Sequence, residues 1–292
     1  MHNEHPQKLE AALYVVATPI GNLRDITLRA LDVLTQADVV AAEDTRNTAH
    51  LLSHHTIRAK QLIAVHQHNE RGAADKIIAL LQAGQSVAFV SDAGTPAVSD
   101  PGALLVQAVL AAGLRVIPIP GASAVVTALS AAGFNEQHFL FYGFLPNKSA
   151  ARRSALQSLQ AHPYALAFYE APHRIVECVA DLCAVLGGER QIILAREMTK
   201  LFETIHSCAL QDAEAWLLSD SNQQRGEFVV LVSGALPQQG LSAESERILK
   251  LLLTDLPLKQ AVQLASQISG VGRNELYERA LEIKNQDKDE LV

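Results

Sequence analysis

Short runs of β-branched residues alternate with amphipathic stretches along the first half of the chain. Side chains repeat every two residues in a strand and about every 3.6 in a helix, so each stretch can be assigned to one element type. The predicted strands are Leu13–Thr18, 38–43, 62–67, 86–91 and 115–120. The predicted helices between them are 27–37, 46–55, 70–84 and 101–113. This alternation predicts βαβ units and a parallel sheet.

Helix ends are marked by capping residues, glycine and proline. Gly84 and Gly113 are expected to end two of the predicted helices. Ser99-Asp100-Pro101 offers a capping residue followed by proline at the first helical position, which predicts a helix start.

The pattern restarts after Gly133 and predicts a second mixed α/β region. Its strands are expected at 138–146, 164–172, 190–198, 201–210 and 227–234, with 190–197 and 202–208 forming a hairpin, a polar helix after Pro146 and another at 176–187. Helical patterns at 244–256 and 257–269, and one that Asn274 would cap, predict a helical C-terminal region. We therefore expect a flexible 1–12, an α/β domain at 13–134, a second at 135–236 and a helical appendage at 237–292, with 237–240 as the linker.

Composition narrows the class of protein. The chain has 292 residues, of which 49% are hydrophobic and 19% charged, as expected for a globular protein of two domains. Its three cysteines form no CxxC pair, and its start has no signal-peptide pattern, so we expect a cytoplasmic protein. The apolar run from Leu104 is too short to span a bilayer. A net charge of −7 argues against a long basic groove for naked nucleic acid, but leaves room for a local basic patch.

Unusual loops follow four of the predicted strands, at 18–25, 43–46, 91–100 and 120–123. Ligands of open parallel sheets bind at the carboxyl ends of strands, so these loops predict a ligand site. Asp92 could accept hydrogen bonds there, and the helix start at Ser123 could offer backbone N–H groups. Each loop alone is equally consistent with an ordinary tight connection. GxGxxG and GxxxxGK[ST] motifs are absent, which disfavours NAD binding and P-loop chemistry.

Charged residues gather at other predicted strand and helix ends. Arg24 and Asp25 could hold phosphate and accept a proton, or form a surface ion pair. The clusters 168–174 and 196–204 could face the first-domain loops across a cleft, or simply be solvated. Segment 147–153 opens the helix in a stretch without acidic residues and is the best candidate for phosphate contact. His66 and His68 lack a matching ligand cluster, so we expect no metal site.

Taken together and in order, these segments resemble the tetrapyrrole methylase superfamily and, within it, the ribosomal RNA small subunit methyltransferase I family. The resemblance rests on the first loop and its flanks (LYVVATPIGNLRDITLRALDVLTQADVVAAEDTR), on VSDAGTPAVSDPG, PIPGASAVVTALSAAG, FYGFLP, FYEAPHR and AREMTKLFETI, and on the terminal LPLKQAV and NELYERAL. It implies two α/β domains that hold S-adenosylmethionine between them, methylation of a cytidine 2′-oxygen in the decoding region of 16S ribosomal RNA, and a homodimer.

Carried over by position, the resemblance implies a set of cofactor-binding residues in both domains. These are Pro19, Asp92, Gly94, Thr95, Ser123, Ala124, Tyr169, Met198, Glu227 and Phe228. Relatives that act on tetrapyrroles carry a GxGxGD-like first loop and a GDPxxxG loop, whereas this chain has TPIGNLRD and SDAGTPAVSD. That departure favours RNA over a macrocycle as the substrate.

Methyl transfer to a ribose requires an in-line approach and help for a weakly acidic hydroxyl. The candidate catalytic residues are Asp25, Arg24, Glu43, Asp44 and Glu197. The candidate RNA-binding cations are Arg46, Lys148, Arg152, Arg153, Arg174, Arg196 and Lys200. We expect the assembled small subunit as substrate. The alternatives are a methyltransferase of the same fold acting on a tetrapyrrole, and a non-catalytic ribosome assembly factor.

Overall fold

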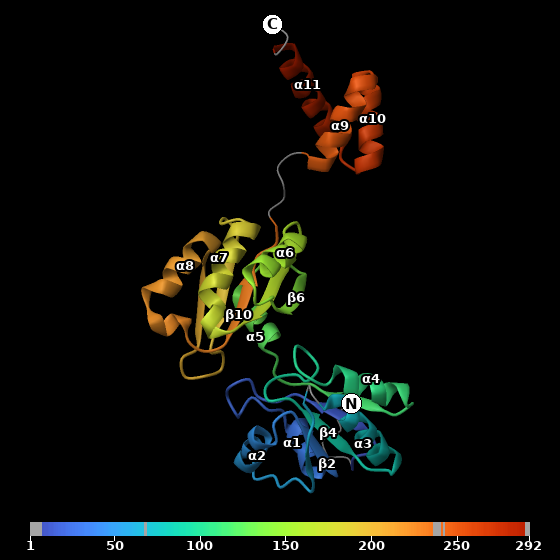
Figure 1. The fold of residues 1–292 in the computed structure, drawn as a ribbon, viewed down its shortest axis with the longest axis vertical. Helices are drawn as coiled ribbons and strands as arrows, with labels where there is room; N and C mark the ends of the chain where they lie inside the picture. The colour runs from blue at the N-terminus through green and yellow to red at the C-terminus, as the bar shows by residue number, and fades with distance from the viewer. Residues whose placement is uncertain (1–7, 67–68, 236–240, 242, 290–292) are drawn as a thin grey trace. The chain divides into compact units, whose positions relative to one another are not determined.

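The computed structural model describes residues 8–66, 69–235, 241 and 243–289 (Figure 1). It divides into two compact units, Met1–Gly234 and Ala235–Val292. The expected linker at 237–240 lies outside the described residues, as does His68.

The first unit begins with a parallel five-stranded sheet. Its strands are β1 (Leu13–Val16), β2 (Val39–Ala42), β3 (Leu62–Ala64), β4 (Val87–Val90) and β5 (Val116–Ile119), in the order β3-β2-β4-β1-β5. The helices that join them are α1 (Leu28–Gln36), α2 (Thr45–His54), α3 (Glu70–Gln82) and α4 (Ala103–Ala111). Helices α1 and α2 share a core with one face of the sheet, and α3 and α4 with the other. The predicted parallel sheet is thus confirmed, and we call this half the first lobe.

Helix α4 begins later than the sequence predicts. The position before the helix is occupied by Gly102, with φ of 126°, and not by Asp100 as Pro101 at the first helical position would require. Its first N–H groups find their acceptor in α3, because Glu70 Oε1 accepts from Gly102 N–H at 3.0 Å and from Leu105 N–H at 3.1 Å. The buried Glu70 carboxylate, placed where the helix dipole favours negative charge, therefore replaces a local cap. Ser99 and Asp100 remain in the loop before the helix.

The second lobe of this unit is a mixed sheet. Strands β6 (Phe139–Phe144), β7 (Ala165–Glu170), β8 (Gln191–Arg196), β9 (Thr204–Ala209) and β10 (Phe228–Val232) follow the order β6-β7-β10-β8-β9. Only β6 and β7 pair in parallel among these strands, and the predicted hairpin of β8 and β9 is confirmed. Helix α5 (Ala124–Ala132) packs on one face, although we expected the first domain to extend to residue 134. Helices α6 (Ser149–Leu159), α7 (Ile175–Leu186) and α8 (Leu210–Ser219) share a core with the other face.

Two short 3₁₀ helices, Pro172–Arg174 and Ser221–Gln224, also belong to the second lobe. The first follows β7 directly and turns the chain into α7.

The second unit is helical, as predicted. Helices α9 (Ala243–Asp255), α10 (Leu258–Ser269) and α11 (Arg273–Asp289) enclose a small core around Leu249 and Leu276. Asn274 lies inside α11 and does not cap it, because the chain is helical from Arg273 and Leu276 N–H already donates to Gly272 O at 3.2 Å.

Substituting alanine at two glycines with positive φ distinguishes the cost of backbone strain from the cost of steric overlap. A Cβ on Gly102 would overlap the ring of Phe89 at φ of 126°, whereas one on Gly84, at φ of 83°, meets no atom within 4 Å. We expect Gly102→Ala to destabilise the first unit by about 3 kcal/mol and Gly84→Ala by about 1 kcal/mol. Denaturant melts of both variants measure this, and equal losses would contradict the predicted overlap.

Candidate functional site

Two loops of the first lobe are joined beyond the carboxyl end of the sheet. Thr18 N–H donates to Gly94 O at 2.8 Å, and Gly94 N–H donates back to Thr18 O at 3.0 Å. The hydroxyl of Thr18, which is buried, donates to Ser91 O at 3.3 Å. These bonds connect the loop after β1 to the loop after β4, as the clustering of unusual loops at this edge predicts.

The β4–α4 loop has an uncommon backbone. Gly94, Ala97, Ser99 and Gly102 have φ values of 74°, 66°, 64° and 126°. Positive φ is costly for Ala and Ser, and such residues persist where the surrounding structure holds them. Ala97 N–H donates to Pro101 O at 3.1 Å, and Thr95 Oγ1 donates to Ala122 O at 3.1 Å in the turn after β5.

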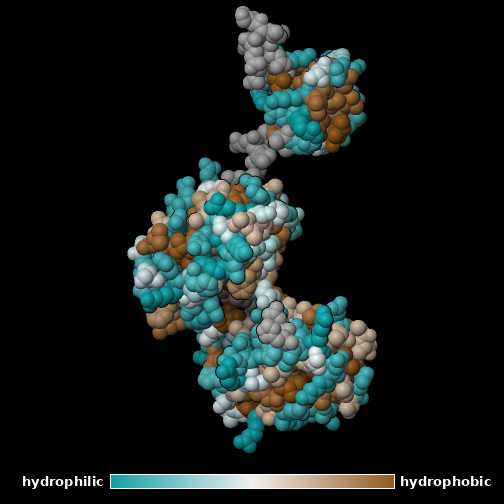
Figure 2. All heavy atoms as spheres, viewed as in Figure 1, coloured by the Kyte–Doolittle hydropathy of each residue, from teal (hydrophilic) through white to brown (hydrophobic). Residues whose placement is uncertain are grey.

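The joined loops form one wall of a cavity of about 380 Å³ in the first unit. Segments from the second sheet, including the ends of β7 and β8 and the start of β10, complete it. Hydrophobic side chains lie in the hollow between the two lobes in Figure 2. The lining residues are Ile20, Ala93, Gly94, Thr95, Val98, Asp100, Ser123, Ala124, Phe144, Tyr169, Glu170, Ala171, Pro172, Ala195, Met198, Lys200, Glu227, Phe228 and Val229. The volume and the mostly apolar wall with a few polar groups are typical of a small-molecule site.

Eight of the ten residues predicted to bind a cofactor line this cavity: Gly94, Thr95, Ser123, Ala124, Tyr169, Met198, Glu227 and Phe228. The other two, Pro19 and Asp92, are not in the wall. Pro19 is buried. Asp92 turns to α2, where its carboxylate accepts from Asp44 N–H and from Asn47 Nδ2, both at 3.1 Å.

Asp100 is a lining residue that the sequence analysis missed. Burial raises its pKa to about 6, and the negative charges of Glu43 and Asp92 act in the same direction. Its position in the same loop as Asp92 was a usable signal, but the proline that follows it suggested only a helix start. A half-desolvated carboxylate in an apolar wall is well placed to meet a positively charged or hydroxyl-bearing ligand.

The candidate bases differ in environment. Burial raises the pKa of Glu43, whose Oε2 accepts from Asp92 N–H at 3.3 Å. Asp44 is the N-cap of α2, and its hydrogen bonds from Arg46 lower its pKa to about 2. Asp25 is exposed on the first loop, beside the exposed Arg24.

Glu197 belongs to a charged cluster at the rim of the cavity. Lys200 Nζ contacts Glu197 Oε1 and Glu227 Oε2, both at 2.8 Å. Although burial opposes ionisation, the bonds from Lys200 and from Glu227 N–H hold the pKa of Glu197 below its usual value. Glu197 has φ of 51°, and a Cβ on Gly226 would overlap its side chain, so Gly226 permits this close packing.

Comparison with known proteins identifies the family. The sequence profile of the Tetrapyrrole (Corrin/Porphyrin) Methylases matches residues 12–214. Ribosomal RNA small subunit methyltransferase I of Pseudomonas aeruginosa is 54% identical over 92% of this chain and 96% of its own. The protein of that name from Escherichia coli O157:H7 is 50% identical over 94% of this chain and 96% of its own. The chain belongs to the tetrapyrrole methylases, within the ribosomal RNA small subunit methyltransferase I family.

Solved structures agree with the fold of this methylase. The methyltransferase CobJ aligns with a TM-score of 0.59 at 22% identity, over 77% of this chain and 94% of its own. Uroporphyrin-III-C-methyltransferase from Thermus thermophilus gives 0.54 at 21% identity, over 76% and 94%. A second profile, the RsmI C-terminal HTH domain, matches residues 239–284.

The described part of the methylase shows neither a membrane-spanning helix nor a metal-binding group. Its helices are too short or too polar to cross a bilayer. The same residues contain no cluster of three or more His, Cys, Asp and Glu side chains arranged around a metal position.

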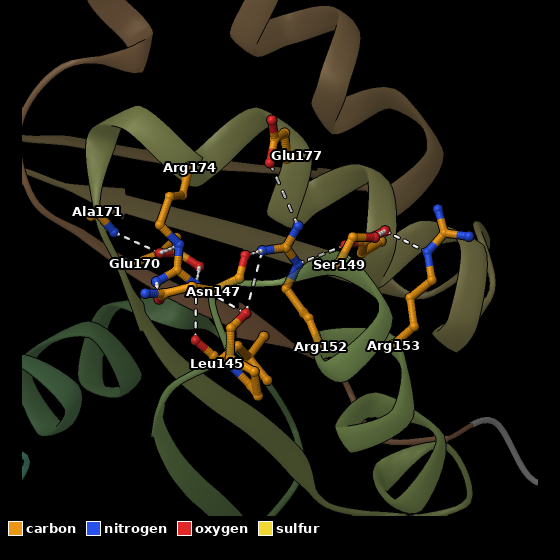
Figure 3. Close-up of polar contacts among 11 residues, drawn as sticks. Leu145, Asn147, Ser149, Arg152, Arg153, Glu170, Ala171, Arg174 and Glu177 are labelled. Carbon is orange, nitrogen blue, oxygen red and sulfur yellow. Dashed lines mark hydrogen bonds and ion pairs between the residues drawn. The ribbon is translucent and has the colours of Figure 1, made fainter.

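Two of the cations predicted to bind RNA are internal to the second lobe of this methylase (Figure 3). The Arg152 side chain is 1% exposed and donates from Nε to Asp181 Oδ2 at 2.6 Å, so it cannot reach a phosphate. That prediction is wrong, because α7 supplies a carboxylate that draws the side chain inward. The Arg174 side chain is 13% exposed; its Nε lies 3.2 Å from Glu170 Oε1, and its Nη2 donates to Leu145 O at 2.8 Å. It also bonds Asn147 Oδ1.

The other predicted cations remain nearer the surface. Lys148 and Arg46 are exposed, and Arg153 keeps half of its side chain exposed while it contacts Asp181. Arg196 is directed to the backbone, where its guanidinium donates to Phe202 O at 3.1 Å and to Arg225 O at 3.2 Å. Lys200 is bound between two carboxylates.

Removing the carboxylate that Arg152 needs should be strongly destabilising. Asp181→Ala leaves the buried Arg152 guanidinium with only the exposed Glu177 carboxylate, 3.8 Å away, as a charge partner, and we expect a loss of about 3–5 kcal/mol of unfolding free energy. Arg153→Ala, which removes only the exposed partner of the same carboxylate, should cost less than about 1 kcal/mol. Urea melts at neutral pH measure both values. A loss below about 1 kcal/mol for Asp181→Ala would contradict the importance of this pair.

Proposed function

We propose that this protein transfers a methyl group from S-adenosylmethionine to the 2′-oxygen of a cytidine ribose in 16S ribosomal RNA. The observation that carries the proposal is the cavity, whose wall contains eight residues that the family resemblance assigned to the cofactor. The relatives named ribosomal RNA small subunit methyltransferase I support the substrate class, because this chain covers nearly their whole length.

The chemistry of the cavity wall fits this cofactor. Bound S-adenosylmethionine supplies an electrophilic methyl on a positively charged sulfur. Asp100 places negative charge in the wall of the cavity, where the charge of Glu227 is paired with Lys200. Met198, Phe228 and Val229 supply buried apolar surface, and the start of α5 at Ser123 can offer N–H groups. The uroporphyrin-III C-methyl transferase from Thermus thermophilus that was solved with S-adenosylhomocysteine shares the fold, with a TM-score of 0.54 at 16% identity.

Among the candidate bases, Glu43 fits proton transfer best. A carboxylate whose pKa is raised by burial binds a proton more readily than one held ionised by a cation. We assign Asp44 to capping α2 and Glu197 to holding Lys200, since their pKa values are lowered by these contacts. Arg24 and Asp25, on the exposed first loop, are proposed to orient the RNA at the entrance.

The substrate is proposed to be the assembled small subunit in the cytoplasm, with the enzyme acting as a homodimer. The net charge of −7 supports a preformed RNA surface, because a weak overall electrostatic attraction must be compensated by many contacts. Lys148, Arg153 and Arg46 remain exposed for phosphate contact.

The proposed function is tested by incubating the protein with labelled S-adenosylmethionine and small subunits from a strain that lacks the enzyme. Mass spectrometry of the RNA should find one added methyl on the ribose of a decoding-region cytidine. Cofactor binding without transfer would indicate an assembly factor. Transfer to a tetrapyrrole in place of the subunit would reassign the substrate.

The pH dependence of cofactor binding tests Asp100. Because a cationic ligand favours the ionised carboxylate and the pKa of Asp100 is about 6, affinity should rise as pH increases through 6. At pH 5 we expect binding about ten-fold weaker than the plateau above pH 7. Calorimetry from pH 5 to 8 measures this. Asp100→Asn should be weak at every pH, whereas Asp92→Asn should keep the dependence with a lower midpoint.

Glu43→Gln tests the proposed base. The variant should lower kcat by about a hundred-fold while leaving cofactor affinity within about two-fold, because Glu43 lies outside the cavity wall. Single-turnover methylation and calorimetry provide the two values. A wild-type kcat for Glu43→Gln would contradict the proposal that Glu43 is the base. Arg24→Ala and Asp25→Asn with full turnover would likewise exclude the first loop.

A further inference from the structure

The turn between β8 and β9, residues 197–203, is held in one conformation by hydrogen bonds that lie outside the sheet. Thr199 has φ of 66°, and its N–H donates to Glu203 Oε2 at 2.6 Å. The guanidinium of Arg196 donates to Phe202 O at 3.1 Å. Asn22 N–H, from the first loop, donates to Thr199 Oγ1 at 3.1 Å. Three hydrogen bonds, to Glu203, Arg196 and Asn22, therefore fix the conformation of the turn.

This ordered turn presents apolar side chains to solvent. Leu201 is 89% exposed and Phe202 is 67% exposed. Single exposed apolar residues are common on protein surfaces. Here two adjacent ones lie on a turn with strained backbone and do not contribute to the hydrophobic core, which indicates another role for them. A rigid aromatic side chain loses little conformational freedom when it binds a partner.

The tip of the turn lies at the rim of the cavity. Lys200 lines the cavity, and Phe202 is two residues further along the chain. Two Cα–Cα steps span at most about 7.6 Å, so the Cα of Phe202 lies no further than that from the Cα of Lys200.

We propose that Phe202 stacks on an unpaired RNA base beside the acceptor nucleotide. The inference rests on the proposed function and extends it to how the nucleotide that receives the methyl group is held at the cavity entrance. A ribose inside a stacked helix cannot bring its 2′-oxygen into a walled cavity, so the nucleotide must leave its stack. An aromatic face at the entrance replaces the lost stacking and tolerates any base.

Charge and area both favour RNA as the occupant. Arg24 and Arg225, both exposed, belong to segments bonded to this turn or to Arg196, so the segments next to the turn carry cations. Aromatic residues interleaved with cations are typical of single-stranded nucleic-acid sites. Two side chains at a turn are far from the roughly 800 Å² per partner of a stable protein interface, which disfavours a second copy of this chain here.

The first experiment compares methyl transfer to unmethylated small subunits by the full-length protein and its variants. Phe202→Ala should lower kcat/KM for the subunit by about 10-fold to 100-fold, the range for loss of one stacked base. Phe202→Trp should retain activity. Leu218→Ala, which truncates a 59% exposed side chain on α8 that does not line the cavity, should match the wild type.

Calorimetry and sedimentation separate the competing explanations. Phe202→Ala should bind S-adenosylmethionine with wild-type affinity and keep the wild-type oligomeric state. Wild-type kcat/KM in Phe202→Ala would overturn the proposal, and so would weakened cofactor binding or a change in oligomeric state. Absence of transfer by the wild type would instead overturn the proposed function.

A binding measurement tests the contact without catalysis. Trp216 is the only tryptophan of the chain, so Phe202→Trp combined with Trp216→Phe places a single reporter at the turn. Stacking should quench its fluorescence when an unpaired RNA oligonucleotide of the acceptor sequence is added. Unchanged fluorescence at saturating RNA, established by anisotropy of a labelled oligonucleotide, would contradict stacking.

Discussion

The pair of backbone hydrogen bonds between Thr18 and Gly94 holds the first-lobe wall of the cavity together. Strands β1 and β4 are neighbours in the sheet, but a sheet ladder ends with its strands and does not order the loops beyond it. The bridge extends the pairing into those loops. It requires Gly94 at φ of 74°, with the Ile20 side chain 3.3 Å from where a Cβ would lie. Ile20, Gly94 and Thr95 reach the cavity wall because of this bridge.

The hydrophobic pattern predicted the first lobe well because its central strands β2 and β4 are buried on both faces. Uninterrupted apolar runs such as Val39–Ala42 and Val87–Val90 have few alternatives to a central parallel strand. The second lobe was less predictable. Helix α8 was missed, because a ten-residue pattern directly after a strand resembles a continuation of it. Strand order is set by tertiary packing, which periodicity does not encode. Asn274 was a plausible cap by residue type, yet the chain was already helical before it.

The candidate site likewise has parts that the sequence predicted and parts that it did not. Small and turn-forming residues directly after strands predicted the cavity wall, because in a parallel sheet every such loop reaches the same edge. Arg152 was misassigned for the opposite reason. Its partner Asp181 lies 29 positions away on another helix, and only the packing of α6 on α7 brings the two together. Asp100 was missed because its role depends on desolvation, a property of the folded surroundings and not of residue type.

The β4–α4 loop is fixed at both ends before any ligand is present. Gly94 is bonded to Thr18 at one end, and at the other the Glu70 carboxylate binds the N–H groups of Gly102 and Leu105. The conformational entropy of this segment is therefore lost when the chain folds. A molecule that arrives later does not have to immobilise the segment, and its affinity is not reduced by that ordering. Discrimination between ligands at this wall then depends on shape and charge, because a loop held in this way cannot change conformation to fit a different ligand.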